Sequence, residues 1–500
     1  AQAHTGAAPT RQSGFTQAGA LALYLMFWGA VAWLGLTFLS HGSAHGELAL
    51  AVWILLVGAV TGATCGLLGC FLVLRRMSLV GDAISHAVLP GIALGYLLSG
   101  SVAGLPILLG AMLLGVATTL IAQTLTQWGR VSEDASLGIV FTSLFALGVI
   151  LIQVAARHVD LDADCVLYGQ IDFAGVDLVR VGPWEISRPL RMLVPALAIT
   201  LAVVLLLWKE LVLVAFDPAL AAAMGFRVGL LHAVLMTLVA GVCVAAFEAV
   251  GSIVVVAMLV VPAATAVQLA DRAGWVAAWS VAIGSTSAIL GYLLAEWWAT
   301  SVAGAMAVAA GLQFTAALLF APRRGLVPQL ARQLALAVRI AGEDVLARLY
   351  RSEEPSLVPS IEEAAAPPPA RPQAGLWRTL AEQAQRGWAG RLARWRLLHR
   401  GWVTSDPQGR LHLSTDGRAA ARQLVRAHRL WESYLDTHFD LPRDHLHEAA
   451  ERMEHFLPQP LQDELAKELA DRTVDPHGQV IPPGQPAPGQ TKPPQPPTSR

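Results

Sequence analysis

The sequence predicts an all-α membrane protein with about eight to ten transmembrane helices and a C-terminal cytoplasmic, mainly helical domain. Hydrophobic residues make up 55% of the chain and charged residues only 14%, whereas a soluble globular domain carries about 25% charged residues. Apolar runs follow one another between residues 18 and 320, and several reach the roughly 20 residues that cross a bilayer. From about residue 321 the composition is that of a soluble protein.

About ten apolar runs are candidate spans, and neighbouring runs could merge or re-enter the bilayer. Their glycines and alanines suit close packing of helices in lipid. The runs lie near 18–40, 47–74, 83–99, 103–126, 135–155, 192–214, 229–247, 250–270, 275–296 and 301–320.

Arginines in the loops predict the orientation, because cytoplasmic loops carry an excess of arginine and lysine. If the spans alternate, most loop arginines fall on one side: Arg75, Arg76, Arg130, Arg227, Arg272, Arg323 and Arg324. A smaller set opposes them in the long loop on the other side: Arg157, Arg180, Arg188 and Arg191. The majority places the C-terminal half in the cytoplasm.

Composition divides the chain into four parts. Residues 1–322 form the transmembrane domain, and 323–375 combine an amphipathic helical connector with an Ala/Pro-rich linker. Residues 376–482 form the cytoplasmic domain, and the Pro-rich tail at 483–500 is expected to be disordered.

Asp82 and His86 stand at the start of an apolar run, four residues apart. On a helix they share one face, where a carboxylate oxygen and an imidazole nitrogen could hold one cation. The same pair could be a buried hydrogen bond. Ionisable groups within a membrane usually mark a substrate path, which favours the ligand interpretation.

The segment "LGCFLVLRRMSLVGDAISHAVLPGIALGYLL" (68–98) resembles the signature of metal-type ABC permeases, the membrane subunits of manganese, zinc and iron importers. Four further stretches resemble the same family in the same order, at 133–152, 161–171, 216–232 and 249–266. The resemblance covers about residues 45–322. It implies a permease dimer in the bacterial cytoplasmic (inner) membrane, an ATP-binding subunit and an extracellular or periplasmic metal-binding protein.

By this resemblance Asp82 and His86 line the path of the metal. Glu248 is added on the residues alone, as an acidic group in an apolar run, and it could equally face water at a span end. The segment 216–232 resembles the part of the family that docks on the ATPase. The predicted docking residues are Asp217, Pro218, Ala222 and Gly225.

The chain is not expected to be an enzyme. A phosphate-binding loop of the Walker A type needs a Gly-Lys step, and the lysines Lys209, Lys467 and Lys492 do not follow glycine. A separate chain therefore hydrolyses ATP, or transport is not driven by ATP.

A second set of histidines and carboxylates lies in the cytoplasmic domain. His428 and Glu432 are four apart, and a later segment places four such residues on one helical stripe: His447, Glu451, Glu454 and His455. Imidazole and carboxylate ligands suit a divalent transition metal. The alternative is a solvated, charged helix face.

Residues 393–482 resemble the middle of the diphtheria-toxin-repressor family of metal-dependent regulators, with 401–421 similar to its wing. By this resemblance the six residues just named are metal ligands. Iron-type members have cysteine where this chain has Glu451 and manganese-type members have glutamate, so manganese is favoured, with iron or zinc possible. The family's N-terminal helix, which supplies further ligands, has no counterpart that we identify in the sequence.

The predicted function is the permease subunit of an ABC importer of manganese, iron or zinc with a fused metal-sensing domain. The alternative is a membrane-anchored, metal-responsive transcription regulator. Arginines at 386–401 could contact phosphates, but two tryptophans among them indicate packing, and nucleic-acid binding is not expected.

Overall fold

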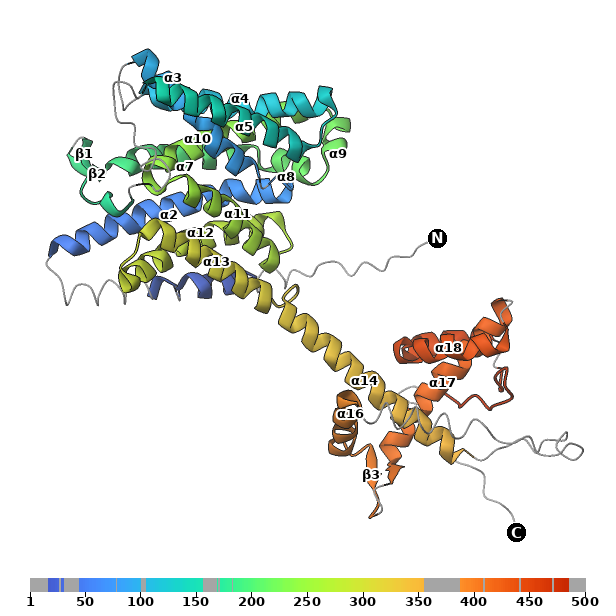
Figure 1. Cartoon of the computed structure of the whole chain (residues 1–500). Coiled ribbons are helices and arrows are strands. Elements are labelled where there is room, and N and C mark those ends of the chain that lie inside the picture. Colours follow the sequence, from blue (N-terminus) through green and yellow to red (C-terminus); the bar gives the residue numbers. More distant parts are fainter. Residues whose placement is uncertain are drawn as a thin grey trace, which may run out of the picture. The chain divides into compact units, whose positions relative to one another are not determined.

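The structure is a computed structural model that divides into two compact units, Ala1–Gln329 and Leu330–Arg500 (Figure 1). It describes residues 17–26, 28–30, 45–77, 79–99, 105–155, 169, 171–181, 183–354, 387–407, 410–439, 442–469 and 472–484. The predicted Ala/Pro linker, nearly all of the Pro-rich tail and most of the predicted outer loop at 161–171 lie outside these residues. We call the first unit the membrane unit and the second the C-terminal unit.

The membrane unit is built from long apolar helices. They are α2 (His45–Leu74), α3 (Val80–Ser99), α4 (Leu105–Gly129), α5 (Glu133–Ala155), α7 (Arg188–Leu206), α8 (Trp208–Phe216), α9 (Pro218–Ala223), α10 (Val228–Val250), α11 (Ser252–Leu269), α12 (Ala273–Trp298) and α13 (Val302–Phe320). Within the described residues, seven helices are long and apolar enough to cross a membrane, and shorter apolar helical stretches lie at Gln17–Ala30, Pro90–Ser99 and Ala135–Leu151. The predicted polytopic, mainly helical fold is confirmed.

Glycines let the spans pack closely, as the sequence predicts. A Cβ atom at Gly62 of α2 would lie 2.1 Å from the carbonyl oxygen of Gly284 in α12. The same relation joins α3 to α4, where a Cβ atom at Gly91 would lie 2.4 Å from the carbonyl oxygen of Gly110. Larger side chains at these positions would force the helices apart.

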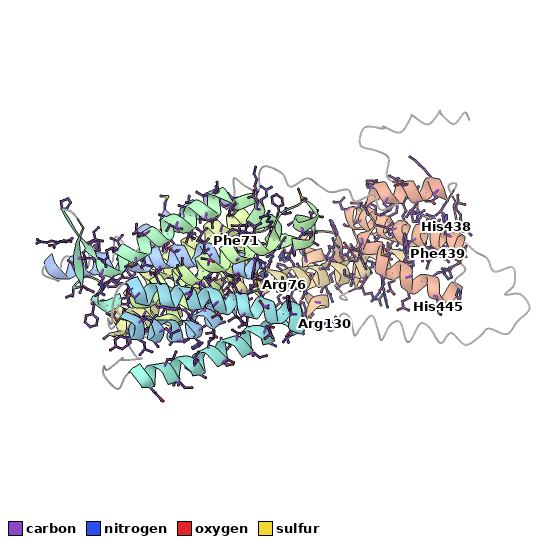
Figure 2. The ribbon with its side chains drawn as sticks, turned by 90° about the horizontal axis from the view of Figure 1, so that it is seen from above. Phe71, Arg76, Arg130, His438, Phe439 and His445 are labelled. Carbon is purple, nitrogen blue, oxygen red and sulfur yellow. The ribbon has the colours of Figure 1, made fainter. Side chains whose placement is uncertain are left out.

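Two arginines follow the ends of α2 and α4 at the same end of the membrane unit, Arg76 and Arg130 (Figure 2). Both adopt the left-handed backbone conformation that commonly terminates a helix, with φ of 60° and 54°. At the other end of the spans, a short 3-10 turn (η1, Ile171–Phe173) leads into an antiparallel hairpin of β1 (Leu178–Val181) and β2 (Trp184–Ser187).

The C-terminal unit holds most of α14 (Leu326–Glu353), the helix that follows the last span. Its other elements are α16 (Trp388–His399), β3 (Val403–Ser405), β4 (Leu411–Leu413), α17 (Thr415–His438), α18 (Arg443–Met453), a 3-10 turn η2 (Glu454–Phe456) and α19 (Gln459–Glu468). The antiparallel β3–β4 pair is the predicted partial winged-helix hairpin. Leu346 of α14 packs with Leu397 of α16 and Ala421 of α17 in the core of this unit.

Candidate metal centres

The first turns of α3 place Asp82 and His86 next to each other. His86 Nε2 lies 3.6 Å from Asp82 Oδ1, and the two side chains are 37% and 47% exposed, respectively. Two aromatic rings of α5 hold the imidazole, with Phe141 stacked at 5.8 Å and Phe145 edge-on at 5.4 Å between centroids. Within the described residues, the pair therefore presents one imidazole nitrogen and one carboxylate on a partly accessible face.

The third predicted path residue, Glu248, lies in α10, but its side chain is outside the described part of the chain. The predicted docking residues lie in and around α9. Asp217 caps this helix by accepting a hydrogen bond from Leu220 N at 2.9 Å, Pro218 and Ala222 belong to it, and Gly225 ends it with φ of +88°.

In the C-terminal unit, three predicted ligands converge between α17 and α18. Glu432 Oε1 lies 3.1 Å from His428 Nε2 and 2.9 Å from His447 Nδ1. His428 and Glu432 are buried, whereas the His447 side chain is 46% exposed. Their potential ligand atoms lie within 4.8 Å of one another, so one ion could contact all three. We call these residues the His428 site.

A second group joins η2 to α14. His455 Nε2 lies 3.2 Å from Asp344 Oδ1, and His455 Nδ1 lies 2.8 Å from Glu343 Oε2. Asp344, Glu454 and His455 again offer ligand atoms within 4.8 Å of one another, and we call these three the His455 site. Glu454 is buried and connects the two sites, because its Oε2 is 2.6 Å from His428 Nδ1, although not aligned for a hydrogen bond.

A third group forms on the other side of Glu432. Its Oε2 atom lies 3.5 Å from His477 Nδ1, and Asp475 brings a further carboxylate within the same 4.8 Å range. Glu432 could therefore bridge two ions, one through each carboxylate oxygen.

The sequence-predicted ligands thus fall into two adjacent sites, with one exception. Glu451 lies on α18, partly exposed, and belongs to none of the ligand groups found among the described residues. The prediction missed Glu343, Asp344, Asp475 and His477. A usable signal was present, since Glu343 and Asp344 are adjacent carboxylates within the amphipathic helix α14. This helix precedes the β3–β4 hairpin in the chain.

Protonated histidine side chains offset the negative charge of these carboxylates. Burial lowers the pKa of His455, but contacts with Asp344 and Glu343 outweigh burial and raise it to about 9. The pKa of His428 is also raised, because contacts with Glu432 and Glu454 outweigh its burial. Burial raises the pKa of Glu432, yet His428 and His447 hold it well below its usual range. A metal ion that binds here must therefore displace protons from the imidazoles.

The donor chemistry fits a divalent transition metal. The grouped residues supply imidazole nitrogens and carboxylate oxygens, with no thiolate. Imidazole suits zinc and iron, and carboxylate suits manganese. The set therefore accommodates manganese, iron or zinc.

The comparisons with known proteins agree with this division of the chain. Residues 47–321 match the model of the ABC 3 transport family, and residues 414–483 match the iron dependent repressor, metal binding and dimerisation domain. The manganese transport system membrane protein MntD of Bacillus subtilis is 40% identical over 296 residues, which are 59% of this chain and 100% of the relative.

Two further proteins match a similar share of the chain. The zinc transport system membrane protein TroD of Treponema pallidum is 39% identical over 55% of this chain and 75% of its own length. The solved structure of PsaBC from Streptococcus pneumoniae in complex with Fab is 33% identical, with a TM-score of 0.48, and covers 59% of this chain and 97% of that one. The family match spans more than half of the sequence, and the chain therefore belongs to the ABC 3 transport family.

Proposed function

We propose that this chain is the permease of an importer of divalent manganese and that its C-terminal unit senses the imported metal in the cytoplasm and restrains import. Iron and zinc are the alternative substrates. The manganese preference is supported by the relatives described for manganese transport and by the carboxylate-rich ligand sets of the C-terminal unit.

One observation carries the sensing role. A permease needs ligands along its membrane path, yet this chain carries further ligand groups in a separate folded unit. Under the proposed orientation these groups lie in the cytoplasm, where imported metal accumulates. A site there reports the internal metal level.

The route from sensor to permease is proposed to be α14. This helix supplies Asp344 to the His455 site, and Arg351 near its end lies 3.3 Å from buried Glu454. Its first residue, Leu326, follows the last span after a five-residue turn, 321–325. In that turn Arg323 and Arg324 both pair with Asp271 in the loop between α11 and α12. A change in how the sensor holds α14 would therefore reach the spans through an anchored turn.

The proposed assembly contains two permeases, an ATP-binding subunit on each, and an extracellular or periplasmic metal-binding protein. The exposed helix α9 is the proposed contact with the ATP-binding subunit. Leu220 of this helix is 48% exposed, and Met224, directly after its end, is 62% exposed. These side chains suit a protein interface more than water.

A second candidate function, metal-responsive transcription control from the membrane, has one supporting feature. Arg391, Arg394 and Arg396 are exposed on α16, beside the β3–β4 hairpin. Sequence-selective binding of an operator by the full chain would favour it. Transport is the preferred function because residues 47–321 of the membrane unit match the ABC 3 transport family.

Metal uptake tests the proposal directly. The chain is produced with its ATP-binding partner in cells that lack their own manganese importer, and initial uptake of manganese, iron and zinc is compared. We expect saturable manganese uptake that requires ATP hydrolysis by the partner. Uptake of none of the three metals would refute the proposed transport function.

A further inference from the structure

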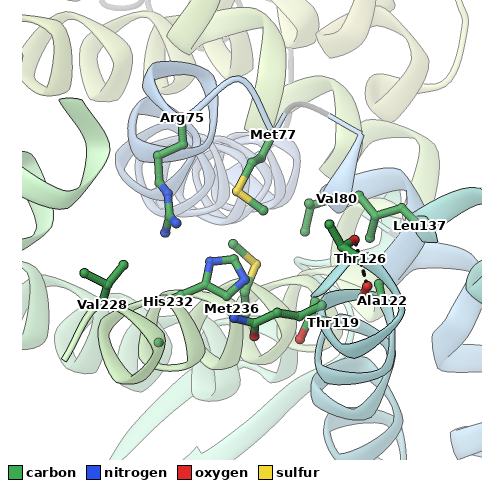
Figure 3. A pocket seen from close by; sticks show the side chains of 12 residues that line it. Arg75, Met77, Val80, Thr119, Ala122, Thr126, Leu137, Val228, His232 and Met236 are labelled. Atoms are coloured by element: carbon green, nitrogen blue, oxygen red, sulfur yellow. Dashed lines mark hydrogen bonds between the residues drawn. The ribbon is translucent and has the colours of Figure 1, made fainter. Parts of the chain in front are cut away.

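One cavity of the membrane unit lacks the ligands that manganese prefers. It has a volume of about 360 Å³ and lies between helices α3, α4, α5 and α10 and the turn after α2 (Figure 3). Its described lining includes His232 and the thioethers of Met77 and Met236, but no aspartate or glutamate. Thioethers are soft ligands, whereas manganese prefers carboxylate oxygens. A further manganese site is therefore expected where carboxylates gather, as they do in the C-terminal unit.

The third ligand group described above consists of Glu432, Asp475 and His477, and we call it the Asp475 site. Glu432 belongs to two groups at once. Its Oε1 atom lies 3.1 Å from His428 Nε2 and 2.9 Å from His447 Nδ1, whereas its Oε2 atom lies 3.5 Å from His477 Nδ1. The two oxygens of one buried carboxylate therefore face two different sets of ligands.

A turn after α19 fixes Asp475 in place. The Oδ1 atom of Asp475 accepts hydrogen bonds from the backbone N–H groups of His477 at 2.9 Å and Gln479 at 2.7 Å. Gly478 completes the turn with φ of +79°, a conformation that glycine adopts without strain. The side chain of Asp475 is 3% exposed, whereas that of His477 is 40% exposed. An ion can therefore enter from solvent and still contact a buried carboxylate.

The charge around the Asp475 site favours a cation. Glu432 and Asp475 bring two carboxylates into the group. Arg429 lies nearby, with its Nε atom 3.6 Å from Asp475 Oδ2. Both terminal nitrogens of Arg429 pair with Glu354, at 3.0 and 2.6 Å. Because Glu354 offsets the charge of Arg429, a divalent ion in this group meets the charge of Asp475 and shares that of Glu432 with the His428 site.

We propose that the Asp475 site binds a divalent ion beside the ion of the His428 site, with Glu432 bridging the two. The inference rests on the sensing role proposed above and adds a third ion to the C-terminal unit. Paired metal ions in proteins lie about 3.5–4 Å apart, a distance that one bridging carboxylate spans. Two carboxylates and one imidazole suit manganese, and water completes its coordination.

The Asp475 site contacts α14 by a different route from the His455 site. Asp475 lies against Arg429, and Arg429 holds Glu354, the residue directly after the end of α14. The His455 site instead uses Asp344, in the interior of the same helix. An ion that draws on the Asp475 carboxylate leaves Arg429 to pair more strongly with Glu354. Filling the Asp475 site should therefore tighten the end of α14, the helix proposed to lead to the spans.

Manganese counting in the purified full chain tests the proposal. Bound manganese per chain is measured by equilibrium dialysis in detergent, and the electron paramagnetic resonance spectrum of the bound Mn(II) is recorded. We expect His477→Ala to bind one ion fewer than the unaltered chain and to replace the spectrum of a spin-coupled pair with that of isolated ions. His438→Ala is the matched control, because His438 also lies beside a carboxylate, Glu468 at 3.4 Å, and belongs to none of the ligand groups found among the described residues.

Hydrogen exchange of the segment 345–354 tests the connection to α14. Manganese should slow exchange there in the unaltered chain and in His438→Ala, and it should slow exchange less in His477→Ala. Because the His477 side chain is partly exposed, the unfolding temperature of His477→Ala without metal should match that of the unaltered chain.

The proposal is overturned if His477→Ala keeps the full number of ions and the spin-coupled spectrum, or if manganese slows exchange equally in both variants. Glu454→Gln separates this outcome from a failure of the sensing role. A loss of bound manganese in Glu454→Gln but not in His477→Ala refutes the Asp475 site alone. Undiminished binding in both variants refutes the sensing role as well.

Discussion

Under the proposed sensing role, metal binding at the His455 site is a proton-exchange reaction. The His455 side chain is only 4% exposed, and its pKa is raised from 6.5 to about 9 by Asp344 and Glu343 against the effect of burial. This increase in the pKa corresponds to about 3 kcal/mol in favour of the protonated form. Because the folded-state pKa is raised, this contribution to stability is fully present below about pH 6.5 and is lost as the pH rises through about 9.

The same proton competes with the metal. Between about pH 7 and 9, displacing one proton should raise the apparent manganese affinity by roughly tenfold per pH unit. Asp344→Asn removes a ligand and one of the two carboxylates that hold the proton. It should lower the affinity by roughly 10–100-fold and reduce the number of protons released per ion at pH 8.

Titration calorimetry of the purified full chain measures the manganese affinity. Repeating each titration in two buffers with different ionisation enthalpies also gives the number of protons released per ion. Asp436→Asn is the matched control, because Asp436 lies on α17, pairs with Arg472 at 3.2 Å and belongs to none of the ligand groups. An Asp344→Asn variant that binds manganese as tightly as the unaltered chain, and releases as many protons, would refute metal binding by Asp344.

Three further predictions concern the other sites. Asp82→Asn and His86→Ala should each abolish manganese uptake while the protein still inserts and assembles, and normal uptake by both variants would show that the path lies elsewhere. Gly225→Val forces a β-branched residue into a backbone with φ of +88°, so it should lower transport-coupled ATP hydrolysis by the partner; unchanged coupling would exclude this segment as the docking site. Manganese at 100 times its Kd should stabilise the C-terminal unit by about 2.7 kcal/mol. Glu454→Gln should reduce that stabilisation, whereas Glu448→Gln should not, because Glu448 is an exposed carboxylate. Equal effects of the two variants would argue against Glu454 as a ligand.

Local spacing made much of the fold and part of the sensor predictable. The long apolar runs became the helices of the membrane unit, because a bilayer span is a local property of about 20 residues. The i,i+4 spacing of His428 and Glu432 placed both on one face of α17, where their side chains meet at 3.1 Å. The wing appeared where its turn sequence indicated, as the β3–β4 hairpin.

Contacts between distant segments were not predictable in the same way. Glu343 and His455 are 112 positions apart. No periodic pattern in the sequence indicates that two residues so far apart are in contact. The sequence predicted that His447, Glu451, Glu454 and His455 lie along one helical stripe. In the structure α18 ends at Met453, and Glu454 and His455 lie in the 3-10 turn η2, which changes the direction of the chain. The predicted span at 192–214 is interrupted at Leu207, beside Trp208, whose ring packs edge-on against Phe71 of α2 at 5.6 Å.

In the proposed function, metal bound in the C-terminal unit restrains import. It is tested most directly in proteoliposomes that contain the complete transporter with ATP and buffered manganese inside, by measuring the initial uptake rate of radiolabelled manganese against the internal free concentration. The rate of the unaltered transporter should fall as internal manganese saturates the C-terminal unit, and a Glu432→Gln, His455→Ala double variant should keep its full rate over the same range. An identical decline in both proteins, or no decline in either, would contradict the account.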